Sequence, residues 1–318
     1  MKRIASILTF AALSLPLGAQ KPPTRPKITG IDHVRVYVTN IDRSREFYSK
    51  LMGVRWEEGV CYDKSRPCFA VGWGKNQTIR LEEAPDSEIK NWIAEIAFST
   101  DNVEQMRKYL ASRGVQVSKI SKYSNSNSNQ AYETHFEAHD PEGTPISFIQ
   151  RFAYTIEHPA STRLQDWPTF TQELNVRILH AGFVVKDLER MKRFYIDLLG
   201  FRLYWHGGFK DDGTDWYEIQ VPDGDNWIEF MLNIPSPANH KELGVQNHFS
   251  LGVTNIKSAF DLLVAHGLKV TDDKPEIGRD GKWSFDIYDP DDTRVEFMEF
   301  KPAQKPCCHP YEAAHPTP

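Results

Sequence analysis

One segment of this 318-residue chain occurs twice, and the repeat limits the folds that the chain can adopt. Residues Ile31 to Val54 read IDHVRVYVTNIDRSREFYSKLMGV, and Leu179 to Phe201 read LHAGFVVKDLERMKRFYIDLLGF. Each copy begins with residues that alternate around one His, as in a strand, and continues with a helical apolar face that ends at a Gly. The repeat therefore predicts a strand followed by a helix in both halves of the chain.

A shorter repeat adds a second strand and helix to each half. Residues 95–103 read EIAFSTDNV and residues 248–256 read HFSLGVTNI, and a helical pattern follows each of them. Each segment then reaches an Asp-Pro turn, at Asp140 and at Asp289. The chain thus reads as four units of one strand, one helix and three strands, which is an α+β organisation.

The first residues are typical of a secretory signal peptide. Lys2 and Arg3 precede an apolar run that ends in small residues at Ala19, which predicts a signal peptide over residues 1–19 and an exported protein. Its removal would make the formal net charge of −5 two units more negative, and an acidic surface disfavours nucleic acid as a partner. No later stretch is long and apolar enough to span a membrane.

The four cysteines form two pairs in the sequence. Cys61 and Cys68 could form a disulfide in an oxidising compartment, and two free thiols are the alternative. Cys307 and Cys308 lie in a Pro-rich tail, residues 302–318, which has no hydrophobic period. We expect this tail to be disordered.

The repeated units resemble the vicinal oxygen chelate superfamily, which includes glyoxalase I, methylmalonyl-CoA epimerase, fosfomycin-resistance proteins and extradiol dioxygenases. The resemblance covers Ile31 to Lys301 and rests on the FY…LMG and FY…LLG helix ends, the Asp-Pro turns and the ligand positions below. In that family two units curl into one open, cup-like sheet. The resemblance implies two tandem glyoxalase-like domains, at 28–152 and 177–301, with a linker over 153–176.

The same resemblance implies a metal site in the second half. The family places ligands on the first and last strand of each unit, and these positions carry His180, Glu229, His248 and Glu296. Two imidazoles and two carboxylates suit one divalent ion of Zn, Ni, Co, Mn or Fe, with coordination positions left open. Apolar residues flank both glutamates, so strand alternation turns each carboxylate away from the helices and toward the cup. The alternative is a set of hydrogen-bonded core histidines with glutamates paired to nearby arginines.

The first half has a different set of residues at the equivalent positions, which are His33, Arg80, Glu95 and Ser147. Arginine has no lone pair to give a metal, so we expect Arg80 and Glu95 to form a buried structural ion pair in a degenerate site. A metal held by His33, Glu95 and either His135 or His139 is the alternative.

The ligand pattern resembles that of glyoxalase I, which implies an exported lyase or isomerase that chelates adjacent oxygens of a small substrate. Glu296 or Glu229 would be the general base in a reaction through an enediolate. Further substrate contacts could come from Arg279, Lys282, Trp283 and His206. One alternative is an extradiol-type ring-cleaving dioxygenase with Fe(II), although residues 278–286 lack the His and Tyr of that pattern. Another is a ligand-binding or resistance protein without turnover, and a homodimer is one possible assembly.

Overall fold

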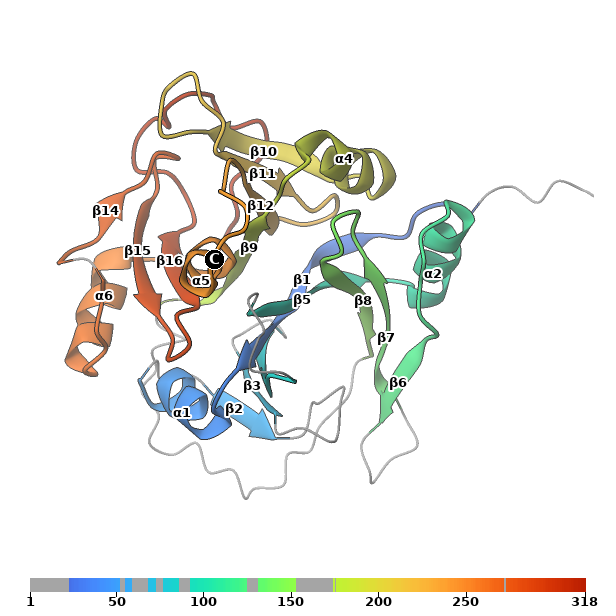
Figure 1. The fold of residues 1–318 in the computed structure, drawn as a ribbon, viewed down its shortest axis with the longest axis horizontal. Coiled ribbons are helices and arrows are strands. Elements are labelled where there is room, and N and C mark those ends of the chain that lie inside the picture. Colours follow the sequence, from blue (N-terminus) through green and yellow to red (C-terminus); the bar gives the residue numbers. More distant parts are fainter. Residues whose placement is uncertain are drawn as a thin grey trace, which may run out of the picture.

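Two curved sheets lie side by side in the computed structural model of the chain (Figure 1). The structure describes residues 23–51, 55–58, 68–72, 77–85, 92–124, 131–152, 174, 176–271 and 273–318. The predicted signal peptide and Cys61 lie outside these residues. Of the predicted linker, residues 153–176, only Leu174 and Val176 are described.

Each sheet has eight strands and is built from one half of the chain. The first sheet has the order β2 (Arg55–Glu58), β3 (Cys68–Gly72), β4 (Thr78–Glu83), β1 (Ile28–Val38), β5 (Ile93–Thr100), β8 (Pro145–Arg151), β7 (Ala131–His139) and β6 (Ser121–Ser124). The second has the order β10 (Arg202–Gly207), β11 (Trp216–Gln220), β12 (Trp227–Met231), β9 (Arg177–Val184), β13 (His248–Val253), β16 (Arg294–Glu299), β15 (Trp283–Tyr288) and β14 (Glu276–Ile277). The predicted tandem α+β architecture is confirmed.

The strand order places the first and last strands of every unit at the centre of a sheet. In the second half β12 pairs with β9 in parallel, β9 with β13 antiparallel, and β13 with β16 in parallel. The four strands that carry the predicted ligands are therefore direct neighbours.

Helices cover the outer faces of both sheets, and their caps explain where they begin. They are α1 (Ile41–Arg45) with the π-helical turn η1 (Glu46–Leu51), α2 (Val103–Ser112), α4 (Leu188–Lys192) with η2 (Arg193–Leu198), α5 (His240–Gln246) and α6 (Ile256–Ala265). Asp187 caps α4, because its side chain accepts a hydrogen bond from the Arg190 amide. Gly200 follows η2 with a φ of 79°, the left-handed conformation in which a Gly commonly ends a helix.

One hydrophobic core runs through both halves. The Tyr48 ring of η1 lies near Phe249 of β13, and Phe98 of β5 packs edge-to-face on Phe201 at 5.5 Å. Two equivalent tyrosines, one in each half, form hydrogen bonds to the opposite half. Tyr48 donates to Asp289 at 3.0 Å, and Tyr195 donates to Asp140 at 3.4 Å. The Asp-Pro turns therefore join the two halves.

Replacing Tyr48 with Phe removes one of these buried hydrogen bonds and leaves an oxygen of Asp289 with one donor fewer. We expect Y48F to lower the free energy of unfolding by about 1–2 kcal/mol, measured by urea denaturation. The matched variant Y195F removes the longer bond and should cost less. Equal losses, or none in Y48F, would contradict the importance of the first contact.

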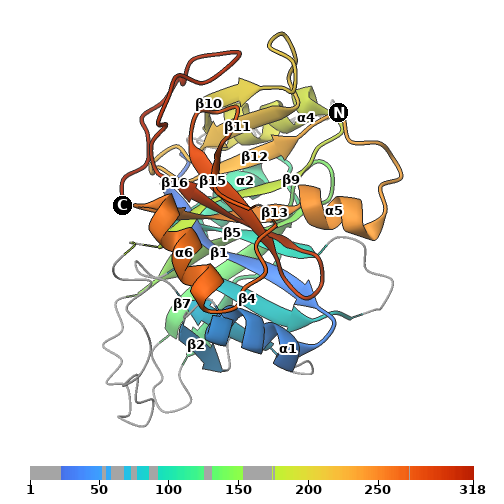
Figure 2. The same ribbon diagram turned by 90° about the vertical axis from the view of Figure 1, so that its left-hand side faces the viewer.

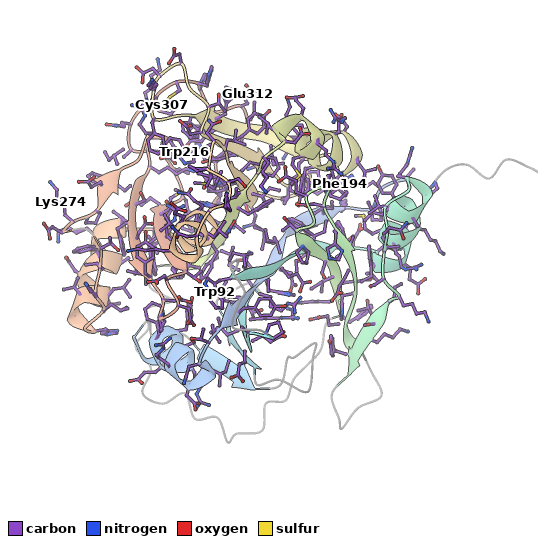
Figure 3. All side chains as sticks on the ribbon, in the orientation of Figure 1. Trp92, Phe194, Trp216, Lys274, Cys307 and Glu312 are labelled. Carbon is purple, nitrogen blue, oxygen red and sulfur yellow. A yellow bond between two sulfur atoms is a disulfide. The ribbon has the colours of Figure 1, made fainter. Side chains whose placement is uncertain are left out.

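The C-terminal tail is ordered, which corrects the prediction of disorder. Tyr311 and Cys307 pack on an apolar patch that includes Tyr204, Trp205 and Trp227. The Glu312 amide donates to the Tyr204 carbonyl at 2.9 Å, and the Trp205 indole donates to the His309 carbonyl at 3.0 Å. In Figure 2 the tail, drawn in dark red, passes beside β10, and Figure 3 shows Cys307 and Glu312 at the same end of the molecule as Trp216. The aromatic side chains of the tail find an apolar surface that no periodicity in the tail itself reveals.

Two cysteine predictions meet different outcomes. Cys307 and Cys308 are joined by a disulfide between adjacent residues. The proposed Cys61–Cys68 bond lies outside the described residues.

Within the part of the chain that is described, no helix has the length and apolar character needed to cross a bilayer.

Candidate metal centre

The cup face of the second sheet carries the four predicted ligands on two adjacent rungs. On one rung Glu229 of β12, Gly182 of β9 and His248 of β13 stand side by side. On the next, His180 of β9 lies opposite Ser250 of β13, and Ser250 lies opposite Glu296 of β16. The two small residues thus lie between pairs of candidate ligands, and the His248 ring occupies the space above Gly182.

The side chains of His180, Glu229, His248 and Glu296 converge. The two histidine Nε2 atoms lie 3.0 Å apart. Glu229 Oε2 lies 3.2 Å from His248 Nε2 and 3.6 Å from His180 Nε2, and Glu296 Oε2 lies 3.3 Å from His180 Nε2. The four side chains thus lie together, with Glu229 in contact with both imidazoles and Glu296 with His180, and their role as metal ligands stays a prediction.

These separations suit ligands of one ion. Atoms bound to a common ion at about 2.1 Å lie roughly 3.0–3.4 Å apart at angles from 90° to 109°. One ligand atom each of His180, His248 and Glu296 lies within 4.8 Å of the others, and Glu296 Oε2 is buried with no hydrogen-bond partner. The donor set and its spacing fit a divalent ion.

Burial shifts the pKa of His180, His248 and Glu296. Both imidazoles are nearly inaccessible, and the glutamate side chains are 11% and 12% exposed, so the centre meets solvent on its carboxylate side. Desolvation lowers the pKa of His180 and His248, and the nearby charges of Lys282 and Arg294 add to this at His180. Burial also raises the pKa of Glu296 to about 8. Neutral imidazoles are the form that ligates a metal.

The connection between the two units orients His248. Helix α5 begins with a capping box in which Asn239 and Glu242 bond each other's backbone, and it ends at Gln246. The Gln246 carbonyl lies 3.0 Å from His248 Nδ1, which fits an Nδ1–H donor and leaves the Nε2 lone pair facing His180. Arg294 Nη2 also lies 2.9 Å from His248 Nε2, and Asp286 lies 3.6 Å from this guanidinium. Asp286 can balance Arg294, so the two glutamates remain to balance a dication.

Sequence reasoning missed Gly182 and Arg294. A Cβ atom on Gly182 would lie 2.5 Å from Nδ1 and 2.9 Å from Nε2 of His248, so the imidazole occupies space that only Gly leaves free. The sequence offered a signal for Gly182, because alternation puts it on the same face as His180. No pattern in the sequence indicates that Arg294 contacts His248.

The first sheet has the same strand pairing as the second, but different residues stand at the equivalent positions. His33 and Ser147 occupy the positions of His180 and Glu296, and Arg35 stands where the second half has Gly182. Arg35 donates to Glu95 at 2.8 Å and to Glu82 at 3.1 Å. A guanidinium thus bonds Glu95, the residue at the strand position that His248 has in the second half.

This arrangement corrects the predicted Arg80–Glu95 pair. Both side chains are buried, but Arg80 Nη2 bonds Glu133 of β7 at 2.8 Å, whereas Arg35 holds Glu95. Arg80 acts on Glu95 through its charge, which helps Arg35 to lower the pKa of that carboxyl against the effect of burial. Three strands separate β7 from β4 in the sheet, and the repeat does not indicate that Glu133 of β7 reaches Arg80.

The four predicted substrate contacts lie in different places. Lys282 is fully buried on the cup side, beside Trp227, whose ring lies 4.8 Å from that of His180. Trp283 instead lines a cavity of about 540 Å³ with α6 residues. His206 stacks on His309 of the tail. Arg279 reaches Asp211 at 2.6 Å. Asp211 forms a second potential ligand group with Cys307 and Cys308, whose sulfurs are joined to each other.

Comparison with known proteins agrees with this geometry. The model of the Glyoxalase/Bleomycin resistance protein/Dioxygenase superfamily matches residues 30–148 and 177–297. Lactoylglutathione lyase of Haemophilus influenzae is 28% identical over 127 residues, which are 40% of this chain and 94% of that protein.

Solved structures of similar fold include two 2,3-dioxygenases. The substrate complex of homoprotocatechuate 2,3-dioxygenase from Brevibacterium fuscum superposes with a TM-score of 0.60 at 18% identity, covering 88% of this chain and 82% of that one. The 2,3-dioxygenase LapB of Pseudomonas sp. KL28 gives a TM-score of 0.63 at 14% identity, covering 93% and 96%. At these identities the likeness concerns the fold.

Proposed function

Because this chain belongs to the glyoxalase/bleomycin resistance protein/dioxygenase superfamily, we propose that its second half is the active site of an exported metal-dependent lyase or isomerase. The observation that carries the proposal is the convergence of two histidine nitrogens and two carboxylates within 3.0–3.6 Å. A divalent ion held by them would act as a Lewis acid toward two adjacent oxygens of a small substrate.

The two glutamates have unequal surroundings, which suggests different roles. Glu229 Oε2 touches both imidazoles and is fixed between them. Glu296 contacts only one imidazole, that of His180. Glu296 is therefore the carboxylate that can turn toward the substrate and accept the proton from the carbon next to a carbonyl. Glu229 would remain a ligand throughout.

Metal content tests the site. Protein purified without chelators should contain one tightly bound divalent ion per chain, measured by inductively coupled plasma mass spectrometry. H180A should lose this ion, and the matched variant H33A, at the equivalent strand position of the first half, should keep it. Two ions per chain, or an unchanged content in H180A, would contradict the proposed site.

Kinetics test the assignment of the base. In an isomerase assay on α-hydroxycarbonyl compounds, E296Q should lower kcat by about 100-fold or more while metal content is retained. E229Q should act mainly through weaker metal binding. If E296Q kept the wild-type kcat with a substrate that the protein turns over, Glu296 would not be the base.

An extradiol-type dioxygenase is a second candidate, and one observation favours it. His180, His248 and Glu296 form a group of two imidazoles and one carboxylate, the ligand set of many non-haem Fe(II) oxygenases. Iron in the purified protein, together with oxygen uptake on catechols, would support this reaction over the isomerase. A protein that binds such compounds without turnover in either assay would instead be a ligand-binding protein.

Export rests on the residues before Gln20. N-terminal sequencing of protein recovered from outside the cytoplasm should begin near Gln20. A mature protein that retains Lys2 would contradict export by signal-peptide cleavage.

A further inference from the structure

Lys282 is a fully buried lysine outside the group of four candidate ligands, which we call the quartet: His180, Glu229, His248 and Glu296. It precedes β15 and has no exposed surface. Three aromatic rings surround its ammonium group, with Nζ 4.2 Å from the Trp227 centroid, 4.8 Å from Tyr204 and 5.2 Å from Tyr311 of the tail. Such a cage stabilises a cation through its ring faces, and among the described residues neither tyrosine hydroxyl accepts a hydrogen bond from Nζ.

The hydrogen-bonding capacity of this ammonium is unused. Nζ has three donors, and among the described residues it has no hydrogen-bond partner. Its nearest carboxylate oxygen, Asp280 Oδ2, lies 3.6 Å away and already accepts a bond from the Tyr311 hydroxyl. Asp280 Oδ1 accepts the Lys282 backbone amide. Asp280 therefore balances the charge of Lys282 without satisfying its donors.

The other carboxyl near Lys282 does not provide this acceptor. Glu218 stands opposite Glu229 on the neighbouring strand, is buried, and has an oxygen with no partner. Its burial raises its pKa well above the usual range, so that it adds little negative charge. A buried ammonium with free donors is costly unless another group bonds it.

Lys282 lies close enough to the quartet for one small molecule to reach both. The Trp227 ring lies 4.8 Å from the His180 ring and 4.2 Å from Lys282 Nζ, so Nζ lies within roughly 9 Å of His180. The charge of Lys282 also contributes to the lowered pKa of His180. A molecule with two oxygens at the metal and a carboxylate on the far side of one ring has this length.

We propose that Lys282 forms an anion subsite beside the quartet, so that the substrate carries a carboxylate in addition to the two adjacent oxygens at the metal. The proposal rests on the proposed function for the position of those two oxygens. Lys282 would donate to the carboxylate, and Tyr204, Trp227 and Tyr311 would exclude water from the contact and so strengthen it.

Binding of two matched probes tests the subsite. Catechol and 3,4-dihydroxybenzoate share the chelating diol, and only the second bears a carboxylate. Zinc-loaded protein should bind 3,4-dihydroxybenzoate at least about tenfold more tightly than catechol in a calorimetric titration, as expected for a charge-assisted hydrogen bond. K282M should remove this preference, while zinc content and catechol affinity stay as in the wild type.

The controls separate the subsite from the metal site. K257M changes an exposed lysine of α6 and should keep the preference. Benzoate cannot chelate a metal through two adjacent oxygens, so its binding to metal-free wild type and K282M tests Lys282 alone. If the protein binds no metal, the proposed function fails, but this comparison still tests the anion subsite. If K282M does not fold, the D280N/K282M double variant removes both charges of the pair and is compared in the same way. An equal preference in wild type and K282M, or none in the wild type, would overturn the proposal.

Discussion

Replacing Gly182 with Ala should abolish tight metal binding by the second half. The added methyl would lie within 2.9 Å of three atoms of the His248 ring, so the imidazole must leave its place beside His180. Small displacements of a ligand or of the groups that orient it typically cost 10- to 100-fold in metal affinity. We expect a loss of about 100-fold or more in G182A, because a ligand itself is displaced.

Competition with a chromogenic chelator measures this loss. The matched control is S250A, on the same sheet face between His180 and Glu296, which removes a buried hydroxyl without a hydrogen-bond partner and adds no volume. S250A should bind metal as the wild type does. Wild-type affinity in a folded G182A protein would show that His248 does not need the space above Gly182.

Removing the tail after Lys301 should destabilise the second half strongly. The tail helps to bury Tyr204, Trp205 and Trp227, which are at most 1% exposed. Uncovering one or two large aromatic side chains costs about 3 kcal/mol or more, and Lys282 would lose the Tyr311 ring at the same time. The truncated chain should therefore unfold at clearly lower urea concentration and show tryptophan fluorescence shifted toward that of exposed indole.

The control for this truncation keeps the tail but changes one contact. Y311F retains the aromatic ring and loses only the hydroxyl, whose hydrogen is shared between the Asp280 carbonyl at 2.9 Å and Asp280 Oδ2 at 3.2 Å. Its loss should be about 1 kcal/mol. A truncated protein as stable as Y311F would mean that the tail is not part of the folded core.

The fold was predictable because several independent features of the repeated segment indicate the same strand and helix. Strand alternation, the Asp cap of α4 and the Gly stop at Gly200 each point to the same unit, and four units in order leave few topologies. The tail was not predictable in this way. Its contacts depend on an apolar patch formed by β10, β12 and β16, and a segment without periodicity carries no sign of the surface to which it binds.

The site was predictable where residues repeat and unpredictable where they do not. His180, Glu229, His248 and Glu296 occupy equivalent strand positions, and the register brings them together. In the first half, equivalence predicted that Arg80 excludes a metal but named the wrong partner for it. Arg35 decides the pairing because it reaches Glu95 from the neighbouring strand, and side-chain reach is set by packing.

Arg35 gives the first half a cation that belongs to the chain itself. The first sheet therefore balances buried carboxylates with a side chain of its own, whereas a metal bound by the second half would come from solution.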